Sequence, residues 1–317
     1  MTSTTTALSL REHLDRYLTE RRGLGYQLET LEHLAGQFCD WLTAQNKSTF
    51  TIDDAVTWAR LPAGAAHAWW GIRLGAVRTF ARYLAAIGMD VQVPPAGLLP
   101  VGSPRAVPYI YSQADLDALL AACAVAFTRS FVPETMRTVV GLLAATGMRI
   151  GEALCITPAD IDTGQDVLTV RSGKSGHLRQ VPLHSSTTGV LLAYRDLPAR
   201  RRVQSDLDGP LFVSSRGTGY HRATIESYFI RLARTAGLQP RAGARPRLHD
   251  LRHTFATTRM ITAYRDVTDP QATLSLLATW LGHTSAAHTY WYLTATPELM
   301  ALAAARLEAP RSGRSAS

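Results

Sequence analysis

Three short segments carry side chains that could act on a phosphate group. Arg149 follows a Thr-Gly turn and precedes Glu152, and Lys174 lies between glycines that permit close approach of a ligand. His249 and Arg252 are three residues apart, so they share a face if their segment is helical. Arginine offers a planar fork of donors to two phosphate oxygens, and histidine can move a proton near neutral pH. Taken alone, each segment is more often a solvated surface feature, and Glu152 could either hold a neighbouring group or stay solvated.

A fourth segment pairs a histidine with a tyrosine. His283 and Tyr292 are nine residues apart, which in one straight helix would separate them by ~13 Å, too far to meet on one phosphate. Gly282 and the polar pair after His283 allow a break that could bring them together. Tyr290 is a competing nucleophile, and positions two apart on a helix differ by about 200°, so only one of the two tyrosines can face a site. Spacing alone does not choose between them.

The composition is that of a soluble globular protein with a basic balance. The 317 residues are 46% hydrophobic and carry 33 lysines and arginines against 25 aspartates and glutamates, a net charge of +8. This charge is compatible with a polyanionic partner such as nucleic acid, but it is no proof of one. The N-terminus has no signal-peptide pattern and no apolar run is long enough to span a bilayer, so we expect no membrane partner.

The three cysteines are far apart, and each lies in an apolar stretch of the sequence: Cys39, Cys123 and Cys155. No CxxC pair is present, so neither a zinc site nor a disulfide framework is indicated. We expect buried free thiols in the reducing cytoplasm.

The elements that must position these residues divide the chain into two domains. Apolar periodicity predicts four helices and no strand over residues 1–92, a small all-helical bundle. Residues 93–108 are rich in proline, which predicts a linker. Residues 109–308 are predicted to form a second domain of helices with two short strands around the Lys174 turn, followed by a flexible tail over 309–317.

Several start and stop signals refine the second domain. Ser112 and Asp115 form a capping box that opens a helix, and Gly147 stops the helix from Pro133 to Thr146. Further helices are expected near 187–196, 223–236, 249–265, 271–281, 285–293 and 297–308. The last of these presents apolar residues that suit packing on the chain's own core or on a neighbouring subunit equally well.

Together the segments resemble the tyrosine recombinase (phage integrase) family. The family's first box, TGxRxxE, is matched at 146–152, and its second, HxLRHTFAT, is matched letter for letter at 249–257. Lys174 is followed at 179–183 by the family's RxVPL pattern. The LGH triplet at 281–283 has a tyrosine nine residues after its histidine. The boxes come in the family's order from Arg149 to Tyr292, and the resemblance covers about residues 109–305.

The resemblance selects Tyr292 over Tyr290 as the nucleophile. It implies attack on a DNA phosphate, a 3′-phosphotyrosyl link and a free 5′-hydroxyl, with religation that needs no ATP. Arg149 and Arg252 would clamp the non-bridging oxygens, a role that magnesium has in many phosphoryl-transfer enzymes, so no metal and no cofactor are expected.

The remaining roles follow from the same resemblance. Lys174 would be the general acid for the leaving oxygen, His249 a candidate base for the tyrosine proton, and His283 a donor to a non-bridging oxygen. Glu152 would orient the pocket. The fold implied is mainly α with a small antiparallel β-sheet: a helical, SAM-like core-binding domain followed by an α+β catalytic domain.

The expected partners are double-stranded DNA, three further copies of the chain in a tetramer on paired sites, and other recombinases of the same mobile element. Exchange would pass through a Holliday junction, in a cytoplasmic, nucleoid-associated protein. Three alternatives stay open. They are a type IB topoisomerase, a non-catalytic DNA-binding protein of the same fold, and a metallohydrolase using His249, His253, His283 and His288, although the HExxH pattern is absent.

Overall fold

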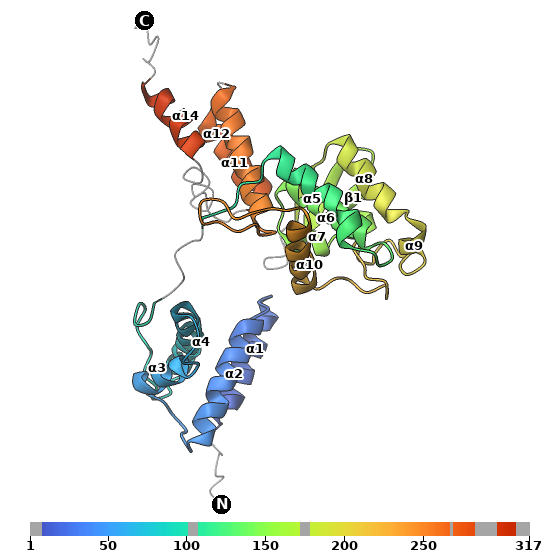
Figure 1. The fold of residues 1–317 in the computed structure, drawn as a ribbon. Coiled ribbons are helices and arrows are strands. Elements are labelled where there is room, and N and C mark those ends of the chain that lie inside the picture. The colour runs from blue at the N-terminus through green and yellow to red at the C-terminus, as the bar shows by residue number, and fades with distance from the viewer. Residues whose placement is uncertain (1–7, 101–106, 172–177, 267–268, 283–296, 309–317) are drawn as a thin grey trace, which may run out of the picture. The chain divides into compact units, whose positions relative to one another are not determined.

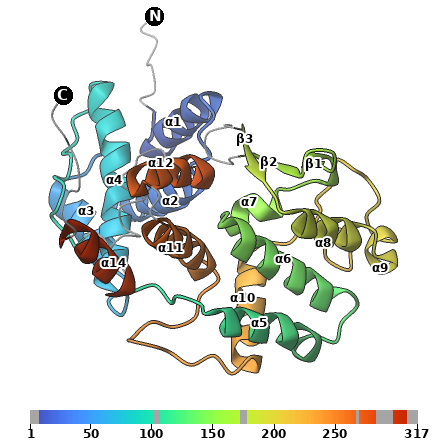
Figure 2. The ribbon, with the colours of Figure 1, turned by 90° about the horizontal axis from the view of Figure 1, so that it is seen from above.

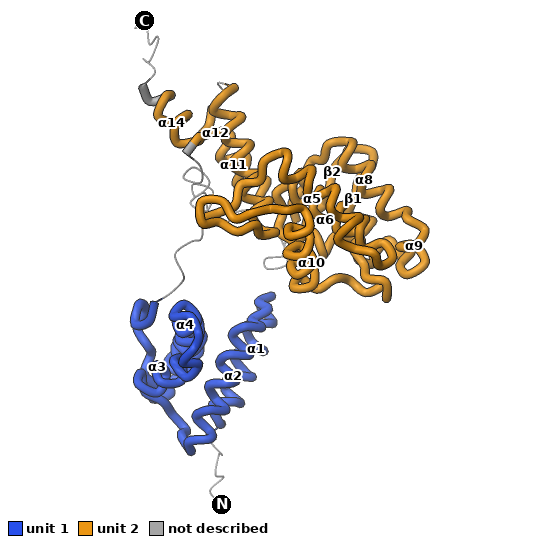
Figure 3. Tube along the Cα trace, viewed as in Figure 1, with its two compact units in different colours: residues 1–106 blue, residues 107–317 orange. Residues whose placement is uncertain are grey.

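A computed structural model describes residues 8–100, 107–171, 178–266, 269–282 and 297–308 of the chain. The chain divides into two compact units, Met1–Ala106 and Val107–Ser317, which Figure 3 colours separately. Each unit has its own hydrophobic core and is described by itself.

The first unit is a bundle of the four predicted helices (Figure 1): α1 (Leu10–Gly23), α2 (Glu29–Ala44), α3 (Ile52–Arg60) and α4 (His67–Ala86). Two of them begin at capping boxes, in which Ser9 pairs with Glu12 and Thr51 with Asp54. Each box satisfies backbone donors that the first helical turn leaves unpaired. Phe38 and Trp58 are fully buried, and their ring centroids lie 5.2 Å apart in the core.

The first part of the proline-rich stretch packs on this bundle. Leu99 is 5% exposed and belongs to the core of the first unit, and Val93 packs against that core. Arg78 of α4 donates hydrogen bonds of 2.8 Å to the carbonyls of Pro94 and Pro95. The rest of the stretch, residues 101–106, lies outside the described residues.

The second unit begins with four helical elements that precede a small sheet. The elements up to the sheet are α5 (Gln113–Ala126), α6 (Val132–Thr146), α7 (Ile150–Leu154) and the 3-10 helix η1 (Pro158–Asp160). The capping box of Ser112 and Asp115 opens α5, as predicted, and α6 ends at Gly147 in the left-handed conformation. In Figure 2, α6 lies between α5 and α8.

The antiparallel sheet has three strands in the order β1-β2-β3: β1 (Ile161–Asp162), β2 (Val167–Arg171) and β3 (Leu178–Pro182). The pairing of the two longer strands confirms the predicted strand pair on either side of Lys174. Strand β1 was not predicted, because two residues are too few to show a strand pattern. In the register of the hairpin, Val170 lies opposite Arg179 and Arg171 opposite Leu178. Because side chains alternate along a strand, Arg171 and Arg179 point to opposite faces of the sheet.

Helices complete the second unit: α8 (Ser185–Arg195), α9 (Pro198–Arg201), α10 (Arg222–Thr235), α11 (Asp250–Arg265), α12 (Pro270–Leu281) and α14 (Pro297–Glu308). All but the one-turn α9 were predicted. The helix expected over 285–293 lies outside the described residues.

The C-terminal helix α14 packs on its own unit. Leu299 is 1% exposed and shares a cluster with Phe255 of α11 and Leu277 of α12. Met300 of the same helix is 54% exposed. The sequence left open whether this helix packs on the chain's own core or on a neighbouring subunit. Leu299 packs on the chain's own core.

One sequence expectation was wrong. Cys39 and Cys123 are buried, but Cys155, the C-cap residue of the five-residue helix α7, is exposed. Among the described residues, helices long and apolar enough to cross a membrane are absent.

Candidate active site

The second unit brings four of the seven predicted site residues into one neighbourhood. These are Arg149, Glu152, His249 and Arg252; both arginines lie close enough to lower the pKa of His249 by their charge. The other three, Lys174, His283 and Tyr292, lie outside the described residues, as does the competing Tyr290. The described chain nevertheless reaches both gaps, since β2 and β3 flank the Lys174 turn and α12 ends one residue before Gly282.

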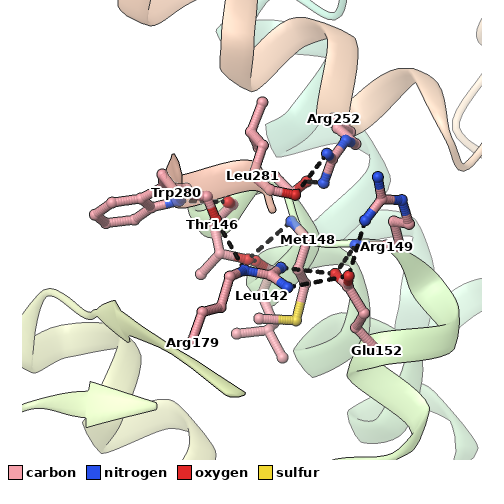
Figure 4. Close-up of polar contacts among 10 residues, drawn as sticks. Leu142, Thr146, Met148, Arg149, Glu152, Arg179, Arg252, Trp280 and Leu281 are labelled. Carbon is pink, nitrogen blue, oxygen red and sulfur yellow. Dashed lines mark hydrogen bonds and ion pairs between the residues drawn. The ribbon is translucent and has the colours of Figure 1, made fainter. Parts of the chain in front are cut away.

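Arg149 is held at the start of α7 by Glu152. As the N-cap residue, Arg149 donates its backbone N–H to Glu152 Oε2 at 2.9 Å and its Nη1 to Glu152 Oε1 at 3.0 Å (Figure 4). The Arg149 side chain is still 44% exposed, while that of Glu152 is 6% exposed. The guanidinium is therefore tethered at one edge and accessible to an anion.

A third residue, Arg179 of β3, completes this cluster. Its Nη1 and Nη2 donate to Oε1 and Oε2 of Glu152 at 3.1 and 2.8 Å, and its Nε donates to the Trp280 carbonyl at 2.9 Å. Burial would raise the pKa of Glu152, but the hydrogen bonds from Arg179 and Arg149 outweigh it and lower the pKa. Glu152 is therefore an ionised carboxylate that joins two arginines, not a solvated one.

Arg252 is fixed by two backbone carbonyls. The residue is 2% exposed, and it donates Nη1 to the Gly147 carbonyl at 2.9 Å and Nη2 to the Leu281 carbonyl at 2.8 Å. These acceptors belong to the turn before Arg149 and to the last residue of α12, so Arg252 joins three segments. Trp280 strengthens the same junction, because its Nε1 donates to the Thr146 carbonyl at 2.8 Å.

The turn at Gly147 requires glycine. Its φ is +64°, and a Cβ atom there would lie 2.6 Å from a ring carbon of Phe255. Only a residue without a side chain can take the left-handed conformation and let α11 approach this closely. The close approach brings Arg252 against the turn that carries Arg149.

His249 is the N-cap residue of α11; it reaches the surface of the second unit, and its imidazole is partly shielded from water. Partial burial and the charge of Arg252 lower the pKa of His249, and burial and the neighbouring His249 lower the pKa of His253 to about 4. The two rings meet edge to face with centroids 5.2 Å apart. Both imidazoles are therefore neutral at pH 7, and a neutral imidazole can accept a proton.

Sequence reasoning missed the parts of Arg179, Trp280 and Gly147 in building the cluster. Arg179 was noticed as the first letter of the RxVPL pattern but was given no role, because its partner Glu152 is 27 residues away. Of the four histidines in the metal-site alternative, His283 and His288 lie outside the described residues.

Comparison with known proteins agrees with this architecture. Residues 111–298 match the model of the phage integrase family, which is more than half of the chain. An integrase/recombinase of Sinorhizobium fredii, y4rB, is 40% identical over 308 residues, covering 95% of this chain and 97% of that protein. A tyrosine recombinase XerC of Roseiflexus is 29% identical over 267 residues, covering 81% and 79%. The chain belongs to the phage integrase family, and its relatives there include tyrosine recombinases.

Solved structures share the fold at low sequence identity. XerH recombinase bound to a palindromic difH substrate has a TM-score of 0.62 at 17% identity, covering 94% of this chain and 85% of that one. A lambda integrase tetramer bound to a Holliday junction has a TM-score of 0.61 at 18% identity, covering 91% and 78%. The Tn1549 transposon integrase with a circular intermediate DNA has a TM-score of 0.64 at 17% identity, covering 95% and 100%. These likenesses confirm the predicted mainly helical fold with a small antiparallel sheet.

Proposed function

We propose that this protein is a site-specific DNA recombinase that cuts and rejoins DNA through a covalent bond to Tyr292. The observation that carries the proposal is the meeting of Arg149, Arg252 and His249 beside the end of α12. Two guanidinium groups and a neutral imidazole are the groups that an in-line phosphoryl transfer to a phenol needs. Membership of the phage integrase family supports the same chemistry.

The proposed reaction begins with the Tyr292 oxygen attacking the scissile phosphorus. The phenol proton passes to His249, whose lowered pKa leaves it able to accept at neutral pH. The bond to the 5′-oxygen breaks as Lys174 donates a proton to it, and a 3′-phosphotyrosyl link remains. Attack by another 5′-hydroxyl reverses these steps, so the phosphoester energy is kept and no ATP, metal or cofactor enters the scheme.

Each arginine has a separate part in stabilising the transition state. Arg252 is held by two carbonyls and Arg149 by a carboxylate, so both forks are oriented before DNA arrives. Such preorganised donors stabilise the charge that grows on the non-bridging oxygens, each by about 3–4 kcal/mol. His283 would donate to one of the same oxygens.

The proposed partner is double-stranded DNA, with the chain acting as a tetramer on paired sites of a mobile element. In this scheme the first unit is a core-binding DNA-binding domain and the second the catalytic domain, with the proline-rich stretch as linker. The lambda integrase structure contains a tetramer on a Holliday junction, and the Tn1549 structure contains an integrase with a circular intermediate DNA. These precedents support the assembly proposed for this chain.

A randomised duplex library with a nick in one strand tests the nucleophile. Cleavage near a nick releases a short fragment, so the covalent adduct cannot religate and survives denaturing electrophoresis, with or without EDTA. We expect adducts with wild-type protein and with Tyr290→Phe, and none with Tyr292→Phe, which should still bind DNA. Sequencing the trapped DNA identifies the site.

Four outcomes would count against the proposal. An adduct with Tyr292→Phe would assign the nucleophile elsewhere, and loss of the adduct in EDTA would indicate metal chemistry. DNA binding without any adduct would indicate a non-catalytic member of the fold. Relaxation of supercoiled plasmid without products from paired sites would favour the topoisomerase alternative.

A further inference from the structure

Arg179 is not one of the predicted phosphate ligands, yet all three of its guanidinium nitrogens are engaged in the cluster around Glu152. Arg179 is the second residue of β3, and its side chain is 14% exposed. All three of its guanidinium nitrogens donate, two to Glu152 and one to the Trp280 carbonyl. The side chain thereby joins the hairpin, α7 and the end of α12 (Figure 4).

Glu152 is saturated by these contacts. Its Oε1 accepts from Nη1 of Arg149 and Nη1 of Arg179, and its Oε2 accepts from the Arg149 backbone N–H and Nη2 of Arg179. Two positive charges thus share one negative charge, and the cluster keeps a net charge of about +1. Without Arg179, Arg149 and the buried Glu152 would form a pair of zero net charge, with the carboxylate drawing Arg149 inward.

Arg179 also lies close to Gly282, the residue that follows α12. Gly282 has a φ of +66°, and a Cβ atom there would lie 3.0 Å from Nη1 of Arg179. His283 is the next residue in the chain. The guanidinium therefore sets both the charge beside Arg149 and the point at which α12 passes into the segment that carries His283.

We propose that Arg179 is a positioning residue that neutralises Glu152 and so leaves the charge of Arg149 available to the DNA phosphate. This inference rests on the proposed function for its consequence in catalysis. It predicts a loss of cleavage rate with little loss of DNA affinity, because Arg179 acts on the phosphate through Arg149. A misplaced or neutralised catalytic group commonly costs about a hundredfold in rate.

The hairpin offers a matched control. Arg171, on β2, donates from Nη2 to Asp160 at 2.9 Å, and Asp160 is a buried carboxylate that also caps its own helix, as Glu152 does. Arg171 points to the opposite face of the sheet from Arg179. Arg171→Gln therefore removes the same kind of ion pair from the same hairpin without touching Glu152.

The experiment compares four variants on the nicked duplex selected by wild-type protein. We expect Arg179→Gln to slow adduct formation by about a hundredfold with DNA affinity within about threefold of wild type, and Arg171→Gln to match wild type. Arg179→Lys keeps the charge and should recover part of the rate. The double variant Glu152→Gln, Arg179→Gln removes both charges, so it should be faster than Arg179→Gln alone. Circular dichroism and the midpoint of thermal unfolding identify any variant that does not fold.

A second measurement needs no DNA cleavage. Phenylglyoxal modifies accessible arginines, and mass spectrometry reads the modification of Arg149. We expect it to fall severalfold in Arg179→Gln and to recover in the double variant. Unchanged modification, or a double variant no faster than Arg179→Gln, would overturn the inference. Absence of adduct with the wild-type protein would overturn the proposed function instead, and the phenylglyoxal result would still decide the role of Arg179.

Discussion

Arg252 donates a hydrogen bond of 2.9 Å to the carbonyl of Gly147, a residue 105 positions earlier in the chain. This contact seats α11 against the turn that leads into Arg149. The two arginines that the sequence predicts as phosphate ligands are therefore held by a shared piece of backbone. A change at Gly147 or Arg252 should move both.

Arg252→Lys should reduce cleavage while retaining the positive charge. A lysine ammonium lacks the planar fork that reaches the Gly147 and Leu281 carbonyls together, so the charge would lose its orientation. We expect adduct formation to slow by about 10²–10³-fold, measured on the trapped nicked duplex. Arg259→Lys, on the exposed side of the same helix, should cleave at the wild-type rate. A fully active Arg252→Lys protein would remove Arg252 from the mechanism.

Gly147→Ala should destabilise the second unit. Alanine would be strained at a φ of +64°, and its Cβ would meet Phe255 at 2.6 Å, which together should cost about 2–4 kcal/mol in the free energy of unfolding. Gly141→Ala is the matched control. Gly141 lies within α6, the helix that ends at Gly147, and a Cβ atom there would have no neighbouring element within 4 Å. The control should be neutral or stabilising by up to about 1 kcal/mol. Urea denaturation measures both, and equal effects would contradict the argument.

Arg200 should be a large contributor to stability although it lies outside the candidate site. It is 1% exposed, and burial lowers its pKa. Its guanidinium donates to four backbone carbonyls: Arg195, Gln204, Pro210 and Leu211. Arg200→Met would leave these buried and partly buried carbonyls without the guanidinium and should cost about 3 kcal/mol or more. The exposed neighbour gives the control, since Arg201→Met should change the free energy of unfolding by less than about 0.5 kcal/mol; the reverse order would refute the assignment.

The stability of the second unit should fall as the pH drops below about 6.5. Burial and the adjacent His249 lower the pKa of His253 from 6.5 to about 4. Between these values the unfolded chain binds the proton and the folded chain does not, so the stabilisation is complete above pH 6.5 and is lost as the pH falls toward 4. The loss should be at most about 3 kcal/mol.

His253→Gln, which does not titrate, tests this expectation. The variant should show a shallower fall in the free energy of unfolding between pH 6.5 and 4 than the wild type. Glu152, whose pKa is lowered in the folded state, loses its contribution at lower pH, below its ordinary value of 4.5. Identical pH profiles for the two proteins would show that His253 is not the group responsible.

Much of the fold could be predicted because its signals are local. The capping box of Ser112 and Asp115 and the stop at Gly147 each depend on residues within three positions of the helix end. Hydrophobic periodicity found the four helices of the first unit for the same reason. The two-residue strand β1 and the one-turn helix α9 were missed, because a period cannot be read from so few residues.

The candidate site divides in the same way. Arg149, His249 and Arg252 could be selected by residue type, spacing and family pattern, since those are properties of the sequence. The pairing of Arg179 with Glu152 could not, because many arginines compete for each carboxylate and only the folding that brings the β2–β3 hairpin beside α7 chooses among them. The sequence by itself therefore determined the helices and the types of the candidate site residues. The tertiary structure decided which charges meet, since ion pairs form between side chains that the folded chain brings within hydrogen-bonding distance.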